Sequence, residues 1–392
     1  MFVDFIISII SFYSCIIVAN FLVNRQLIRI LDFHGKRFQN LDGLRGFLSI
    51  AVFFHHYSIT YVWKIKGYWT TPENICYQNY GKVGVAFFFI LSGFLFTNKI
   101  LNSKVKINWL RFYEGRIFRI FPLYIFTLLF ITGIVFFNSD FKLISNSYEI
   151  LKEYTKWLLF LGCPINQYSD TRLIIAYVDW TLKYELIYYF TLPLLHTLIK
   201  NLSHYMIYVF FAICTILFIY PIDLYYFSSE YFLLFSIGGV VSSLINTRYF
   251  NHKIIKSWYI SLINTFCIIF IIFYPNTLDS IHIIFISISF IFIALGNNIF
   301  GILIKKPCLL LGHISFSIYL LHGLFLYLIF TQFNLINLTE ISKLNYYLFM
   351  PVLSISLILL CTITYCNIEK PFLALGKKYL LTNTASRFSI KY

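Results

Sequence analysis

The stretch NLDGLRGFLSIAVFFHHY, residues 40–57, decides both the fold and the place of the chemistry. It opens with a charged turn that contains Asp42 and Arg45, and continues as an apolar run that carries His55 and His56. Such a run predicts a membrane-spanning helix, in which an ionisable group is costly and therefore a candidate for function. Eleven helical residues return to within about 20° of the start, so His56 lies about 16 Å along the axis from Arg45 on the same face. His55 is rotated by about 80° from that face.

The composition indicates a polytopic membrane protein with an all-α fold. Of the 392 residues, 59% are hydrophobic and only 12% are charged, whereas about 25% charged residues are usual in soluble domains. Several apolar runs reach the roughly 20 residues that span a bilayer. The net charge of +15 does not indicate a nucleic-acid partner, because the basic residues lie in short loops, as the positive-inside rule predicts for a membrane protein.

The apolar runs predict a bundle of about eleven transmembrane helices. The predicted spans are 3–23, 46–62, 82–98, 119–137, 180–199, 203–220, 230–246, 257–274, 280–300, 309–331 and 347–367. We therefore divide the chain into an N-terminal helix (1–24), a membrane domain (25–371) and a short cytoplasmic tail (372–392). The polar tail is predicted to lack regular structure.

The distribution of charge predicts the orientation. Five basic residues follow the first span: Arg25, Arg29, Lys36, Arg37 and Arg45. The predicted outside loops at 221–230 and 275–280 contain no basic residue. This bias predicts an outside N-terminus and a cytoplasmic C-terminus. We expect the membrane to be the plasma (inner) membrane. The longest predicted outside loop, 138–179, contains an amphipathic segment at 148–161 that is predicted to lie on the membrane surface. Whether Cys76 and Cys163, both in predicted outside loops, form a disulfide is left open.

Two arginines at 116 and 119 form a second candidate site. They are neighbours on one helix face at i, i+3, and guanidinium forks suit phosphate. The alternative is that Arg116 and Arg119 anchor the start of a helix at the cytoplasmic surface. Ser92 and Gly93, in FILSGF, are interpreted as a small-residue contact between helices.

Glu185 and His322 are predicted at a membrane depth similar to that of His56. A carboxylate about two turns inside its helix needs a partner or a proton. Thr181 and Tyr189 share the helix face of Glu185. The alternatives left open are a structural hydrogen bond between helices for Glu185, and ordinary helix packing for His322.

Seven stretches together resemble one family. They are LDGLRGFLSIAVFFHH, GKVGVAFFFILSGFLFT, EGRIFRIFPLY, VDWTLKYELIYYF, GNNIFGILI, LLGHISFSIYLLHG and NIEKPF. In this order the chain resembles the acyltransferase 3 family of integral-membrane acyltransferases, which acylate cell-surface glycans. The first helix precedes the usual ten-helix core, and the chain lacks the C-terminal esterase-like domain of some relatives. We therefore expect the membrane part to complete the transfer or to hand over to a separate protein.

The resemblance implies a reaction and a role for each candidate residue. An acyl group, with acetyl as the expected one, would pass from cytoplasmic acyl-CoA to a hydroxyl of an extracytoplasmic glycan such as the O-antigen of lipopolysaccharide. His56 would be the general base, Glu185 would orient it or the acceptor hydroxyl, and transfer would be direct or through an acyl-histidine. Acyl-CoA would bind at Arg45, Arg116 and Arg119, with Asp42, His55, Tyr124 and His322 as possible additional site residues. The alternative for His56 is a hydrogen-bonded structural histidine.

Other classes of function remain as alternatives. A transporter or flippase for glycan precursors would also place His and Glu within the membrane, but we find no inverted repeat. A glycosyltransferase with a lipid-linked donor would need a carboxylate on a large outside loop, where Asp170 and Asp179 are poor candidates. The scattered cysteines form no zinc or redox motif, so no metal is predicted.

Overall fold

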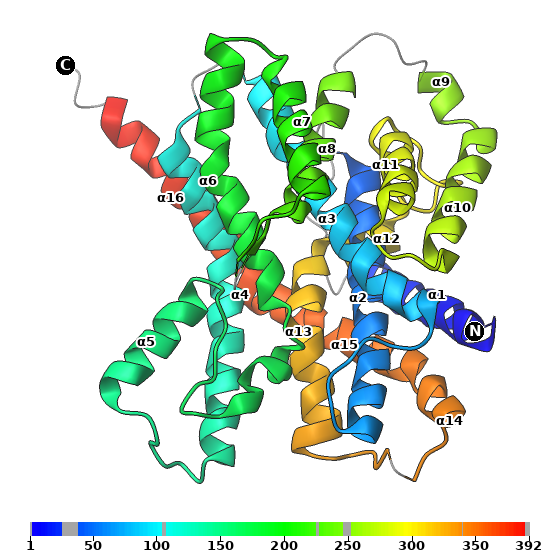
Figure 1. Cartoon of the computed structure of the whole chain (residues 1–392), viewed down its shortest axis with the longest axis vertical. Coiled ribbons are helices and arrows are strands. Elements are labelled where there is room, and N and C mark those ends of the chain that lie inside the picture. Colours follow the sequence, from blue (N-terminus) through cyan, green and yellow to red (C-terminus); the bar gives the residue numbers. More distant parts are fainter. Residues whose placement is uncertain are drawn as a thin grey trace.

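The structure, a computed structural model, is a bundle of helices (Figure 1). It describes residues 2–25, 38–103, 107–224, 227–245, 252–338 and 340–388. The strands of the described chain are β1 (Asp223–Leu224) and β2 (Phe227–Ser228), which pair as a short antiparallel hairpin. The all-α prediction is therefore confirmed. The predicted cytoplasmic residues Arg29, Lys36 and Arg37 lie outside the described residues.

Five helical segments of the described chain are long and apolar enough to cross a membrane. They are Val3–Asn24, Ile75–Asn102, Trp109–Asn138, Ser315–Gln332 and Lys343–Leu380. Four shorter apolar helices, of 14 to 16 residues, are α7 (Met206–Ile219), α8 (Phe232–Ile245), α10 (Trp258–Phe273) and α11 (Ser280–Ala294). A straight span needs about 20 residues, so the number of crossings stays a prediction.

These segments and the other helices carry the following labels and bounds. The longer ones are α1 (Phe2–Asn24), α2 (Gln39–Lys66), α3 (Ile75–Asn102), α4 (Trp109–Asn138), α6 (Asp179–Asn201), α13 (Ser315–Tyr327), α15 (Met350–Thr364) and α16 (Lys370–Phe388). The shorter ones are α5 (Ser147–Leu158), α9 (His252–Ile255), α12 (Lys306–His313) and α14 (Lys343–Leu348), with 3₁₀ turns at Ser169–Ile175 and Ser229–Tyr231. Single π-helical turns occur at Leu328–Gln332 and Tyr365–Glu369.

Local sequence signals fix the ends of the two central helices. Helix α2 ends at Gly67, whose φ of 80° is the left-handed conformation that glycine favours. Helix α3 begins after Asn74, whose side chain accepts a hydrogen bond from the Cys76 amide. The two signals bound the loop between the helices, and the apolar runs on either side of this loop form α2 and α3.

Glycines bring α2 into backbone contact with α12. A Cβ atom at Gly312 of α12 would lie 1.9 Å from the Asp42 carbonyl oxygen, and one at Gly43 would lie 1.9 Å from the carbonyl oxygen of Leu303, in the turn before α12. Side chains cannot be accommodated at such distances, so small residues are required at this crossing. The contact fixes the end of α2 that carries Asp42 and Arg45.

Helices α3 and α8 also cross through glycines. A Cβ atom at Gly93 would lie 2.0 Å from the Phe235 carbonyl oxygen, and one at Gly238 would lie 2.0 Å from that of Ile90. Gly93 therefore makes the predicted helix contact. Its neighbour Ser92 instead lines two pockets described below.

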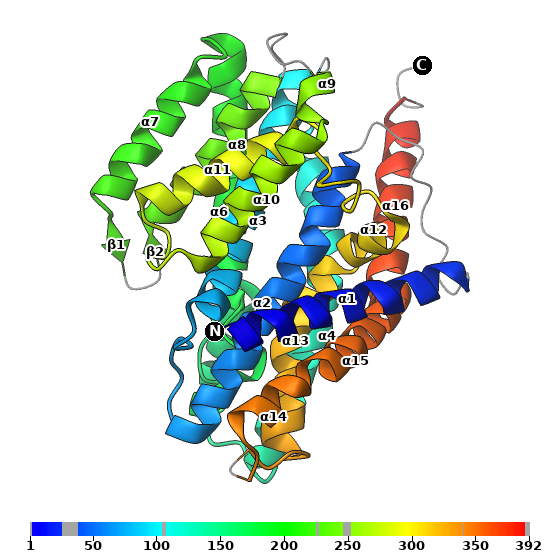
Figure 2. The ribbon, with the colours of Figure 1, turned by 90° about the vertical axis from the view of Figure 1, so that its right-hand side faces the viewer.

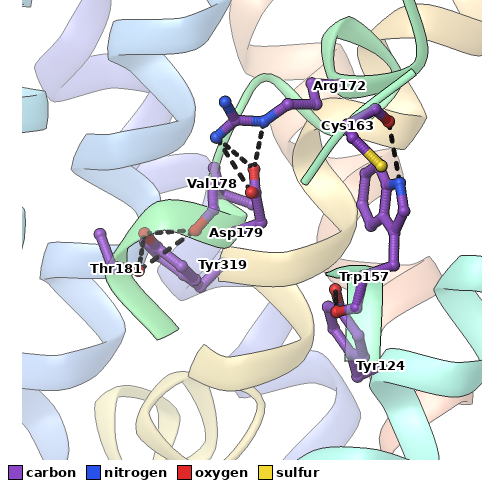
Figure 3. Close-up of polar contacts among 8 residues, drawn as sticks. All are labelled: Tyr124, Trp157, Cys163, Arg172, Val178, Asp179, Thr181 and Tyr319. Carbon is purple, nitrogen blue, oxygen red and sulfur yellow. Dashed lines mark hydrogen bonds and ion pairs between the residues drawn. The ribbon is translucent and has the colours of Figure 1, made fainter. Parts of the chain in front are cut away.

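The segment predicted to be amphipathic forms helix α5, which is tied to α4 (Figure 3). The Tyr124 hydroxyl donates to the Trp157 carbonyl at 2.7 Å, and Trp157 Nε1 donates to the Cys163 carbonyl at 2.9 Å. Both Cys163 and Cys76 are free thiols. The location of α5 at a membrane surface stays a prediction.

The C-terminal segment corrects one expectation. Residues 372–388, predicted to be irregular, continue as helix α16, which follows α15 through the π-helical turn at Tyr365–Glu369 (Figure 2). A Cβ atom at Gly376 would meet the Phe118 side chain of α4 at 2.8 Å. Packing against α4 therefore stabilises a helix that local polarity did not predict, because tertiary contacts override composition.

The glycine crossing gives a stability prediction. We expect Gly93→Ala to lower the free energy of unfolding by about 1–3 kcal/mol, because the added methyl group overpacks the contact between α3 and α8. Gly133→Ala is the matched control, since a Cβ atom there meets nothing within 4 Å. Thermal unfolding of the purified protein in detergent measures both, and equal midpoints for the two variants would contradict the prediction.

Candidate active site

The ring of His56 contacts the ring of His322, which lies far along the chain on α13. His322 Nε2 lies 2.9 Å from His56 Nδ1, and the ring centroids are 4.8 Å apart. His322 is fully buried, whereas His56 is half-buried. The structure therefore brings together two histidines that the sequence only placed at similar depth.

The surrounding carbonyl groups assign the protons of this pair. His322 Nδ1 lies 3.0 Å from the Ile318 carbonyl oxygen, which can only accept, so Nδ1 carries the proton and Nε2 keeps a lone pair. His56 Nδ1 lies 3.1 Å from the Val52 carbonyl oxygen, so it also carries a proton and can donate to His322. In the neutral pair, His56 Nε2 is then left with a free lone pair, as a general base requires.

His55 has a different partner. Its Nδ1 lies 2.8 Å from the Tyr77 carbonyl oxygen. A Cβ atom at Gly81 would lie 2.4 Å from the His55 ring, so the glycine provides the space for that ring. Helical rotation thus separates the two histidines as predicted: His55 contacts α3, and His56 contacts α13.

Both histidines line one cavity, which we call the histidine pocket. It holds about 1000 Å³ of open space. Its other polar wall groups include Lys82, Glu230 and Thr277, and Tyr319 forms part of its wall. Lys82 Nζ donates to Thr277 Oγ1 at 2.5 Å.

The predicted arginines line a second cavity, the basic pocket. It holds about 820 Å³, and its charged wall residues are Asp42, Arg45, Lys99, Arg116, Arg119 and Glu185. Four positive groups face two carboxylates, so the pocket suits an anion.

Arg116 has a further feature that points to a ligand. Its guanidinium lies over the rings of Phe96 and Phe112, at 5.4 and 5.6 Å from their centroids. Its Nε is buried and has no hydrogen-bond partner among the described residues. A buried donor without a partner is costly, and a phosphate oxygen would satisfy it.

A third cavity, the central pocket, adjoins the other two. It shares Arg45, Ser92, Arg119 and Glu185 with the basic pocket. With the histidine pocket it shares Val85 and Tyr319. These shared walls place the three cavities in a row from the arginines to the histidines.

Glu185 lies on the arginine side of this row. Its Oε1 accepts a hydrogen bond from the Tyr189 hydroxyl, and Ser92 Oγ lies 3.5 Å from the same oxygen. It lines the basic and central pockets, whereas His322 is the hydrogen-bond partner of His56. The role of Glu185 stays a prediction.

Two other predicted residues have structural partners. Asp42 Oδ1 lies 3.7 Å from Arg45 Nη1, an ion pair within α2. The Tyr124 hydroxyl binds the Trp157 carbonyl and lines none of these three pockets. The structure thus brings Asp42 to the basic pocket and leaves Tyr124 as an anchor for α5.

Comparison with known proteins decides the family. The family model described as an acyltransferase domain, acyltransferase 3, matches residues 38–366. The chain belongs to the acyltransferase 3 family. Membership supports an acyltransferase enzyme. The match begins after helix α1, and the division of the chain into domains stays a prediction.

One curated relative supports the same chemistry. A protein of Acidianus two-tailed virus, named "Putative acetyltransferase ORF330", is 31% identical over 158 residues. The match covers 40% of this chain and 40% of that protein. No solved structure matches the chain.

Sequence reasoning missed several residues of these cavities. Lys99 follows Ser92 by seven residues, which places both on one face of α3. This spacing could have indicated that Lys99 lies in the same cavity as Ser92. Tyr319 precedes His322 by three residues and shares its face of α13. Its hydroxyl lies 2.6 Å from Thr181 Oγ1, beside the start of α6 (Figure 3).

The proton assignment can be tested by NMR. We expect His56 to carry its proton on Nδ1 at neutral pH, because both of its neighbours at that nitrogen are acceptors. Nitrogen-15 spectra of histidine-labelled protein, with His56→Asn used to assign the signal, report the protonated nitrogen. His55→Asn is the matched control for the assignment. A His56 signal from the form protonated on Nε2 would contradict the assignment.

Proposed function

We propose that this enzyme transfers an acyl group from cytoplasmic acyl-CoA to a hydroxyl of an extracytoplasmic glycan, with acetyl as the acyl group. The observation that carries the proposal is the row of adjoining cavities, which runs from an arginine-rich site to a histidine with a free ring nitrogen. Acyl transfer needs these two components, a site for the anionic donor and a base for the acceptor hydroxyl.

The basic pocket is the proposed site for the phosphates of coenzyme A. Arg116 and Arg119 lie one helical turn apart on its wall, and Lys99 and Arg45 add charge. Arginine forks bind phosphate in bidentate fashion. From there the thioester would extend through the central pocket toward His56.

His56 is the proposed general base. A sugar hydroxyl would give its proton to His56 Nε2 while its oxygen attacks the thioester carbonyl carbon. Collapse of the tetrahedral intermediate would then break the carbon–sulfur bond, and the proton on His56 would pass to the departing thiolate. The imidazolium formed in between would keep its Nδ1 hydrogen bonds to Val52 and His322. Transfer through an acyl-histidine stays open as an alternative route.

If His56 is the general base, substitutions of His56 and of its neighbour His55 should have different effects on the rate of acyl transfer. We expect His56→Ala to reduce coenzyme A release in the presence of glycan by about 100-fold or more, the usual contribution of a positioned base. His55→Ala, the matched control, should retain a measurable rate because the His56–His322 pair persists. The measurement is thiol release from acetyl-CoA by purified protein, with mass spectrometry of the glycan product.

Two outcomes would contradict this prediction. A fully active His56→Ala together with an inactive His55→Ala would transfer the role of base to His55. If the wild-type protein failed to cleave acyl-CoA while moving glycan precursors across vesicles, the chain would be a transporter or flippase.

The donor site predicts a selective binding defect. We expect Arg116→Ala to raise KM for acetyl-CoA by about tenfold or more, because a charged hydrogen bond to phosphate contributes about 1.5–3 kcal/mol. Arg111→Ala is the control, since Arg111 lies on the same helix and lines none of the three pockets. Steady-state kinetics at several acetyl-CoA concentrations would separate KM from kcat. A change in kcat alone for Arg116→Ala would contradict the donor site.

A further inference from the structure

A fourth cavity, the aromatic pocket, lies where the start of α6 faces the β1–β2 hairpin. It holds about 820 Å³ of open space. Its walls include the rings of Trp180, Tyr184, Phe227 and Tyr231.

The aromatic rings form a connected cluster. The centroids of Trp180 and Tyr231 are 5.1 Å apart, those of Tyr184 and Tyr231 are 5.0 Å apart, and Tyr184 stacks on Phe227 at 5.9 Å. The Tyr184 hydroxyl accepts a hydrogen bond from the Ser228 amide at 2.6 Å. The hairpin and α6 therefore hold the rings in place before any ligand binds, which lowers the entropic cost of binding.

An ion pair fixes the beginning of α6 beside this pocket (Figure 3). Arg172 Nη2 donates to both carboxylate oxygens of Asp179, at 2.9 and 3.0 Å, and Arg172 Nε donates at 3.2 Å. The Asp179 side chain is fully buried. This bidentate contact orients the backbone at Trp180, the next residue.

The charges of the pocket are balanced, unlike those of the basic pocket. Lys183 and Asp223 both line it, and Arg172 is paired with Asp179. Flat rings with donors and acceptors of both signs suit a sugar, whose C–H faces stack on aromatic rings and whose hydroxyls both donate and accept. An anionic headgroup or phosphate would instead meet the Asp223 carboxylate as well as Lys183, and Arg172 is already paired with Asp179.

The aromatic pocket adjoins the histidine pocket. Trp180 and Tyr231 line both cavities. A ligand bound against these two rings would therefore have one end toward His56 and the other toward the hairpin.

We infer that the histidine and aromatic pockets are successive subsites for an oligosaccharide acceptor. The sugar that receives the acyl group occupies the histidine pocket, and the next unit of the chain stacks on Trp180 and Tyr231. The inference rests on the proposed acyl transfer and adds to it an acceptor of at least two sugar units.

The test compares acceptors of different length. Fragments of one, two and three sugar units are cut from surface polysaccharide of cells that lack this protein, and thiol release from acetyl-CoA is measured with each. We expect wild-type KM to fall by about tenfold from one unit to two, because one further sugar gains a stacking contact. Trp180→Ala and Tyr231→Ala should lose this difference and keep the KM for acetyl-CoA, and Trp180→Phe should restore it.

Controls separate the possible failures. Trp258→Ala removes an exposed indole on α10 that lines neither pocket, and it should retain the length dependence. Equal KM for one and two units in the wild type, or an unchanged length dependence in Trp180→Ala, would overturn the inference while leaving acyl transfer intact. If the wild-type protein releases no thiol with any acceptor, the proposed function itself fails.

Discussion

The hydrogen bond between His56 and His322 is the interaction on which the site depends. An imidazole inside a helical bundle needs a partner for its polar atoms, because unsatisfied groups are costly away from water. His322 supplies an acceptor to one nitrogen of His56 and leaves the other available. The bond joins α2 to α13, and the glycine contacts between α2 and α12 hold α2 close to this part of the bundle.

The charge and the aromatic character of the side chains that line the cavities change from one end of the row to the other. Positive groups predominate at one end, where Arg116 and Arg119 lie, whereas balanced charges and aromatic rings predominate beyond the histidines. Such a separation suits two substrates of different kinds that approach from different ends. Tyr319 lies between them, on the shared wall of the central and histidine pockets.

The parts of the site that could be predicted from the sequence are those set by a single helix. The 11-residue spacing of Arg45 and His56, and the i, i+3 spacing of Arg116 and Arg119, follow from helical rotation alone. The helical bundle was predictable because an apolar run of about 20 residues satisfies its own backbone hydrogen bonds in a bilayer by forming an α-helix.

Features that depend on packing between helices could not be predicted. The partner of His56 lies on a helix far along the chain, and no local pattern connects the two. Tyr124 shows the same limit, since five residues rotate it by about 140° from Arg119 on α4, and its hydroxyl donates to the Trp157 carbonyl of α5. Helix α16 was missed because its stability depends on α4, against which Gly376 packs.

The most direct measurement of the central claim is a cryo-electron microscopy structure of the protein in a lipid nanodisc with a non-hydrolysable acetyl-CoA thioether. We predict phosphates against Arg116 and Arg119, and the acyl end beside His56, with the His56–His322 contact intact. Density for the donor at another site, or protein atoms that fill the space between the acyl end and the His56 ring, would contradict this prediction.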